Sequence, residues 1–160
     1  MRNRVFLFTI IIFSIIQVTI LDSIKILNVK PDLLLISMVI AALYFELKWA
    51  LFLGIFAGLL KDTLSINTFG ISILLFPLWS FLIIKLSKKI SMDNNFICAV
   101  FVFFIMIFNT IITRLILLFF GKSSISLGIF VRIAFIESLY TALIWPLLLR
   151  TTRALILKSK

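Results

Sequence analysis

The chain has 160 residues, of which 63% are hydrophobic and 14% are charged, and it carries a formal net charge of +10. Soluble domains are about half apolar and about a quarter charged, so this composition excludes an ordinary water-soluble protein and indicates an integral membrane protein. Histidine is absent, cysteine occurs once, and the common motifs of hydrolases, nucleotide-binding proteins and zinc sites are missing, so no enzyme, metal or cofactor is predicted.

Six hydrophobic runs follow one another along the chain, separated by short polar breaks. They are Val5–Leu21, Leu33–Phe45, Trp49–Leu60, Ile71–Ile84, Phe96–Phe120 and Ile125–Leu149. They predict one domain over residues 1–160, folded as an all-α, compact bundle of six transmembrane helices. About 20 residues of helix cross a bilayer core, so the first, fifth and sixth runs can span unaided. The other three are short, and we expect some to be tilted, kinked or shielded by neighbouring helices.

The distribution of basic residues predicts the orientation. With the amino terminus in the cytoplasm, inner segments hold ten Lys and Arg, which are Arg2, Arg4, Lys48, Lys85, Lys88, Lys89, Arg150, Arg153, Lys158 and Lys160. Outer segments hold four, which are Lys25, Lys30, Lys61 and Lys122. This bias fits the positive-inside rule and places both termini in the cytoplasm. The positive charge then indicates contact with anionic membrane lipid and no nucleic acid. Tyr44, Trp49 and Trp145 are expected at the inner interface.

The three prolines are expected to shape individual helices. Pro31 lies two residues before the second run and is expected to mark a helix start. Pro77 and Pro146 lie inside runs, where a proline removes a backbone hydrogen bond and kinks the helix.

A stripe of small residues marks the third run. Gly54, Gly58 and Asp62 are four residues apart, so they share one face of a helix. Such glycines let a second helix approach closely, which predicts helix packing, either within the fold or against a partner protein. Asp62 follows Lys61 at the end of the run, so a solvated interfacial charge is an equal alternative for it.

Three charges lie deep in the last two runs. Arg114 and Arg132 are at matching depth in an antiparallel hairpin, and Glu137 is at the centre of its run, on a face shared with Tyr140. Each such charge costs roughly 2.5 kcal/mol or more in the membrane. We therefore expect Arg114, Arg132, Glu137 and Tyr140 to form an intramembrane polar cluster, with Asp62 as a further candidate member. In the alternative, both arginines extend to lipid headgroups and Glu137 is protonated.

Two segments of the chain resemble the rod shape-determining protein MreD family. The first combines Pro31-Asp32-Leu33-Leu34-Leu35 with Gly54-x-x-x-Gly58-Leu59-Leu60-Lys61-Asp62 and then Gly70, and the second is Glu137-Ser138-Leu139-Tyr140-Thr141-Ala142-Leu143-Ile144-Trp145-Pro146. One departure from the family pattern is Glu46-Leu47-Lys48, where a small residue is common in the family.

The resemblance implies a non-catalytic scaffold subunit of the bacterial cell-elongation machinery in the inner membrane. It implies a single-span MreC-like partner and, through that partner, a relation to the MreB filament, the glycosyltransferase RodA and a penicillin-binding transpeptidase. It also implies a fold similar to the substrate-binding subunits of energy-coupling-factor transporters. A small-solute-binding membrane transport subunit is the alternative, because buried Arg and Glu could hold an anionic or zwitterionic solute. A lipid-modifying enzyme is less favoured, because the six acidic residues are scattered.

Overall fold

The structure is a computed structural model that describes residues 2–23, 29–64, 70–88, 95–121 and 126–158. Its helices are α1 (Arg2–Ser23), α2 (Leu33–Tyr44), α3 (Leu47–Leu64), α4 (Ile71–Ser87), α5 (Asn95–Phe119) and α6 (Leu127–Lys158). The six predicted helices are thereby confirmed, one for each hydrophobic run. Four of the basic residues used to predict the orientation, Lys25, Lys89, Lys122 and Lys160, lie outside the described residues.

The short helix α2 forms the centre of the bundle. Every residue from Leu33 to Ala42 is buried, and α2 contacts each of the other five helices. Twelve residues make a helix of about 18 Å, shorter than the roughly 30 Å of a bilayer core. A helix that is apolar on all sides is stable when it is enclosed on all sides. The neighbouring helices therefore shield α2, which allows such a short run to be stable inside the bundle.

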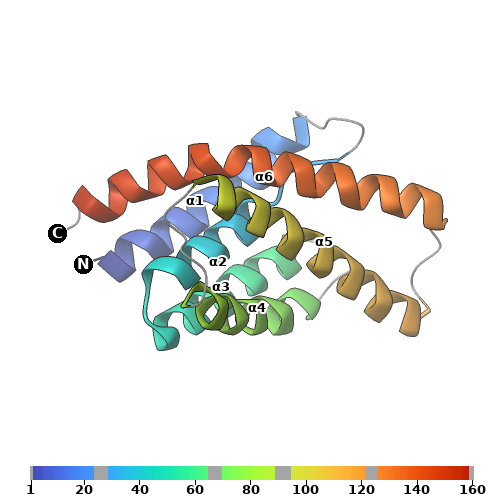
Figure 1. Cartoon of the computed structure of the whole chain (residues 1–160), viewed down its shortest axis with the longest axis horizontal. Helices are drawn as coiled ribbons and strands as arrows, with labels where there is room; N and C mark the ends of the chain where they lie inside the picture. The colour runs from blue at the N-terminus through green and yellow to red at the C-terminus, as the bar shows by residue number, and fades with distance from the viewer. Residues whose placement is uncertain (1, 24–28, 65–69, 89–94, 122–125, 159–160) are drawn as a thin grey trace.

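Helices α5 and α6 form a long hairpin along the outside of the bundle (Figure 1). In the part of the chain that the structure describes, Phe96–Phe119 and Leu127–Thr152 are the two stretches long and apolar enough to cross a membrane. The rings of Phe103 and Phe135 join the two helices edge to face, with centroids 5.8 Å apart. Phe104, Phe108 and Leu143 on their outer faces are more than half exposed, which is typical of helices that face lipid.

The two ends of the described chain lie at the same end of the bundle. Figure 1 places the beginning of α1 and the end of α6 at the same end of the bundle, and the end of α5 and the beginning of α6 at the opposite end.

One aromatic residue departs from the expected interfacial position. Trp49 is 43% exposed, whereas Trp145 is completely buried in the core. Trp145 lies on the face of α6 that also buries Ser138, Thr141 and Leu148, residues three or four positions apart. The sequence predicts the position of Trp145 along α6, but the direction of its side chain depends on how α6 is rotated about its axis.

Candidate functional site

Asp32 begins the central helix. Its backbone is extended, and one oxygen of its carboxylate, Oδ1, accepts a hydrogen bond of 2.9 Å from the Leu35 N–H. Aspartate is among the preferred residues at this capping position because it satisfies a backbone donor that has no partner inside the helix. Pro31, which directly precedes it, is consistent with the predicted helix start.

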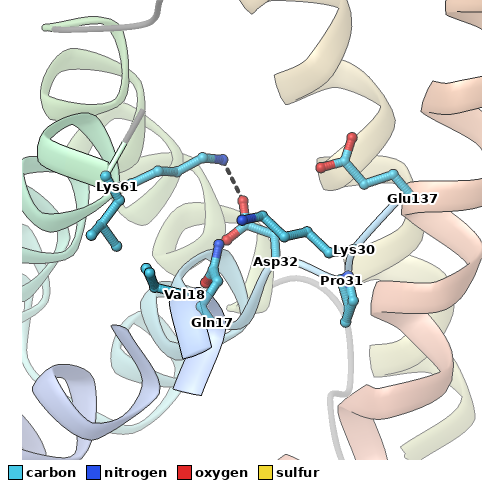
Figure 2. Close-up of a pocket in the computed structure, with 8 residues that line it drawn as sticks. Gln17, Val18, Lys30, Pro31, Asp32, Lys61 and Glu137 are labelled. Atoms are coloured by element: carbon cyan, nitrogen blue, oxygen red, sulfur yellow. Dashed lines mark hydrogen bonds and ion pairs between the residues drawn. The ribbon is translucent and has the colours of Figure 1, made fainter. Parts of the chain in front are cut away.

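The beginning of α2 is bonded to three other helices. From α1, the Gln17 side chain accepts a hydrogen bond of 3.2 Å from the Leu34 N–H. From α6, Thr141 Oγ1 accepts one of 3.2 Å from the Asp32 N–H. From α3, the Lys61 ammonium group pairs with Asp32 Oδ2 (Figure 2). These contacts join α1, α2, α3 and α6 at one point.

A polar cavity of about 160 Å³ lies at this junction. It is lined by Gln17, Val18, Lys30, Pro31, Asp32, Lys61, Leu64 and Glu137. Figure 2 shows Glu137 on the opposite side of the cavity from Lys61. The charges of Lys61, Asp32 and Lys30 all act on the Glu137 carboxylate through space. We refer to this space as the polar cavity.

Asp62 points in a different direction from its neighbour Lys61. It is 1% exposed, and its two oxygens accept hydrogen bonds of 3.2 Å from the Ser72 N–H and 3.0 Å from the Ile73 N–H. Gly70, at the capping position of α4, has φ of 91° and no side chain with which to cap the helix. Asp62 on α3 therefore supplies this cap, and it is a buried structural carboxylate, not a solvated charge.

The glycine stripe of α3 packs against α4. A Cβ atom added at Gly58 would lie 2.7 Å from the Ser72 carbonyl carbon and 2.9 Å from Ile73 Cα. A Cβ atom at Gly54 would lie 3.3 Å from the backbone of Pro77. Of the two types of packing predicted for Gly54 and Gly58, the structure shows the contact within the fold.

The structure does not bring the predicted polar cluster together. Glu137 lines the polar cavity, whereas the Arg114 guanidinium lies 4.1 Å from the centre of the Phe130 ring. Phe130 is seven residues before Glu137, about 10 Å along the axis of α6. Arg132 is exposed and Tyr140 is half-buried. Arg132 and Glu137 are separated by about 140° around the helix, so they cannot both face the bundle interior.

The other two prolines lie inside helices, as predicted. Pro77 is within α4 and Pro146 is within α6. Close to Pro77, the indole N–H of Trp79 donates a hydrogen bond of 3.2 Å to the Asn109 side chain, which joins α4 to α5.

Sequence reasoning missed the roles of Gln17, Asp32 and Lys61 in the polar cavity, and that of Thr141, which binds the Asp32 N–H beside it. Asp32 carried a usable signal, because an aspartate directly before a long apolar run is a typical helix cap. Gln17, a single amide within an apolar helix, also indicated a need for a hydrogen-bond partner. No local spacing identifies those partners, because Lys61 is 29 and Thr141 is 109 positions from Asp32.

Within the described ranges, no group of three or more His, Cys, Asp or Glu side chains could hold a metal ion. Long apolar helices with exposed hydrophobic faces, arranged around a buried short helix, define a small all-helical membrane protein. The family model for the rod shape-determining protein MreD matches residues 1–154, and the chain belongs to that family. The predicted family is thus confirmed, and with it a role in rod shape determination and membership of a membrane protein family not known for enzymes. No curated protein and no solved structure matches the chain.

Proposed function

We propose that this protein is a non-catalytic scaffold subunit of the bacterial cell-elongation machinery, which synthesises peptidoglycan during growth as a rod. The family match over residues 1–154 is the observation that carries the proposal. In this proposal the chain lies in the inner membrane, crosses it six times and has both termini in the cytoplasm. Its six described helices and the shared position of its two ends support that arrangement.

The proposed partner is a single-span, MreC-like membrane protein. The glycine stripe of α3 cannot receive its helix, because α4 already occupies that stripe. An outer groove of about 520 Å³ between α5 and α6 is available instead. It is lined by Phe96, Ala99, Val100, Phe103, Leu139, Ala142, Leu143 and Pro146. Apolar walls with small residues permit the close approach that helices need in lipid.

A pair of alanine substitutions tests this docking site. Ala142→Leu adds a bulky side chain to the groove, whereas Ala154→Leu makes the same change at an exposed position of α6 outside it. Each variant is co-expressed with the MreC protein of the same cell and purified in mild detergent. We expect Ala142→Leu to lose the partner while it still elutes as a single folded species, and Ala154→Leu to retain it. Full retention by Ala142→Leu would exclude the groove.

The MreC-like partner is proposed to connect the protein to other components of the elongation machinery. We propose that the scaffold relates indirectly to the MreB filament, RodA and a penicillin-binding transpeptidase, and that its fold is similar to the substrate-binding subunits of energy-coupling-factor transporters. Depletion of the protein from a rod-shaped cell should make the cells round. Retention of rod shape during depletion would contradict the scaffold function.

A transport subunit that binds a small solute is the second candidate, and the polar cavity is the observation that favours it. Such a protein should purify with a bound solute and without a protein partner, and its depletion should leave cell shape unchanged.

A further inference from the structure

The polar cavity contains charges of both signs. Lys30 and Lys61 contribute two ammonium groups, and Asp32 and Glu137 contribute two carboxylates, so the formal charge of the lining is zero. An unpaired ion is costly to bury. A balanced set of charges therefore suits a ligand that is itself neutral overall and carries both signs.

The two carboxylates of the cavity differ in how far they are already satisfied. Asp32 uses one oxygen for the Leu35 N–H and the other for Lys61. Glu137 faces the cavity, and none of the described residues donates a hydrogen bond to its carboxylate. A sheltered carboxylate ordinarily accepts several hydrogen bonds. Glu137 is thus available for a donor from outside the protein.

Donors for an anionic group lie on the other side of the cavity. The Gln17 carbonyl oxygen is occupied by the Leu34 N–H, so the amide of Gln17 retains two N–H donors. Lys30 and Lys61 line the same space. The volume of about 160 Å³ exceeds the roughly 10–15 Å³ that one water needs and is below the roughly 300–1,000 Å³ of sites for drug-sized ligands. A small ligand or a lipid headgroup therefore fits, and a large metabolite does not.

We propose that the polar cavity binds a small zwitterion whose primary ammonium group pairs with Glu137 and whose anionic oxygens bind Lys30, Lys61 and the Gln17 amide. This chemistry has two sources, the headgroup of a phosphoethanolamine lipid and a free amino phosphodiester or amino acid. The site goes beyond the scaffold function and does not depend on it, because none of its charged residues lines the groove between α5 and α6.

Binding measurements on the purified full chain test the proposal. The probes are free glycerophosphoethanolamine, free glycine, and phosphatidylethanolamine or phosphatidylglycerol in mixed micelles. Native mass spectrometry and the thermal unfolding midpoint report binding. The proteins are the parent chain, Glu137→Gln and the control Glu46→Gln, which makes the same change at an exposed position. We expect the parent and Glu46→Gln to bind a zwitterionic probe. Glu137→Gln should bind it at least about tenfold more weakly.

The source of the zwitterion follows from which probe binds. Binding of phosphatidylethanolamine alone identifies a lipid headgroup, and binding of a free probe identifies a soluble zwitterion. The proposal is overturned if the parent binds none of the zwitterionic probes, if it binds phosphatidylglycerol equally well, or if Glu137→Gln binds like the parent.

A second variant separates ligand binding from an effect on folding. Lys30→Met, at a half-buried position of the cavity, should weaken the binding of glycerophosphoethanolamine more than the binding of ethanolamine, which lacks the anionic group. If Lys30→Met weakens the binding of both compounds equally, the assigned orientation of the ligand is wrong.

Discussion

Asp32 performs two tasks with a single carboxylate. One oxygen caps α2 and the other pairs with Lys61. Both groups are sheltered, since Asp32 is 2% and Lys61 is 22% exposed. Removing either partner leaves an unpaired charge in a poorly solvated place, which is far more costly than the loss of a surface ion pair.

Substitution of Asp32 can separate the two tasks. Asp32→Asn keeps an oxygen that caps α2 but loses the charge, whereas Asp32→Ala loses both. Breaking a buried pair costs about 3–5 kcal/mol, and partial exposure of Lys61 favours the lower end. Losing the cap adds about 1 kcal/mol. Thermal unfolding in detergent should therefore rank the parent above Asp32→Asn and Asp32→Ala last.

A second change provides the control for this pair. In the double variant, Lys61→Met removes the ammonium group that Asp32→Asn leaves unpaired. The double variant should therefore recover part of the stability that Asp32→Asn alone loses. If Asp32→Asn and Asp32→Ala unfold at the same temperature, the cap contributes nothing.

Asp62 should behave as a capping residue for α4. Asp62→Ala leaves the N–H groups of Ser72 and Ile73 without their acceptor, and each buried donor left unsatisfied costs about 1–3 kcal/mol. We expect a clear fall in the unfolding temperature, whereas Glu46→Ala, at an exposed position, should have little effect. An unchanged unfolding temperature for Asp62→Ala would contradict this assignment.

At the scale of the helix, the contact between α3 and α4 depends on the absence of side chains at two positions. Gly58 lies against the α4 backbone, which cannot rotate away, whereas the nearest atom to a Cβ at Gly54 is the Ser80 hydroxyl oxygen, at 2.8 Å. A hydroxyl oxygen can change rotamer more easily than a backbone can shift. The two glycines are therefore unequal, although the sequence presents them as one motif.

Alanine substitutions should reveal this inequality. Gly58→Ala should destabilise the protein by about 1–3 kcal/mol through overpacking, and Gly54→Ala by less. Gly128→Ala is the matched control, because nothing lies within 4 Å of a Cβ at that position, and it should be neutral or slightly stabilising, since alanine favours a helix more than glycine does. The unfolding temperatures of the three variants provide the measurement, and equal effects at Gly54 and Gly58 would contradict the ranking.

The sequence predicts the helices much better than their contacts. Hydrophobic runs identify all six helices because lipid requires long apolar segments. They do not show which side of each helix faces inward, since an apolar face suits both protein and lipid. The sequence therefore groups Arg114, Arg132 and Glu137 only as deep charges near other polar residues. Their actual neighbours, Phe130 for Arg114 and the cavity residues for Glu137, depend on helix rotation.

At the scale of the whole molecule, the shared position of the two ends predicts the orientation in the cell. The beginning of α1 and the end of α6 lie at one end of the bundle, and the positive-inside rule favours the cytoplasm for both. Reporters fused to either terminus that are active only in the cytoplasm should both be active. Reporters that are active only outside the cytoplasm should be silent at both termini. A result that places the two termini on opposite sides of the membrane would contradict the orientation.

The complete enclosure of α2 also has a consequence for biogenesis. A segment of about 18 Å whose residues from Leu33 to Ala42 are buried in the protein is too short to cross a bilayer core alone, so we expect its insertion to be completed by the helices synthesised after it. Nascent chains that end after Tyr44 stay anchored by α1 but leave α2 without its neighbours, so they should be degraded rapidly, whereas chains that end after Ser87, which include α3 and α4, should be stable. Pulse-chase labelling of the two truncated chains would measure this difference in the order of assembly.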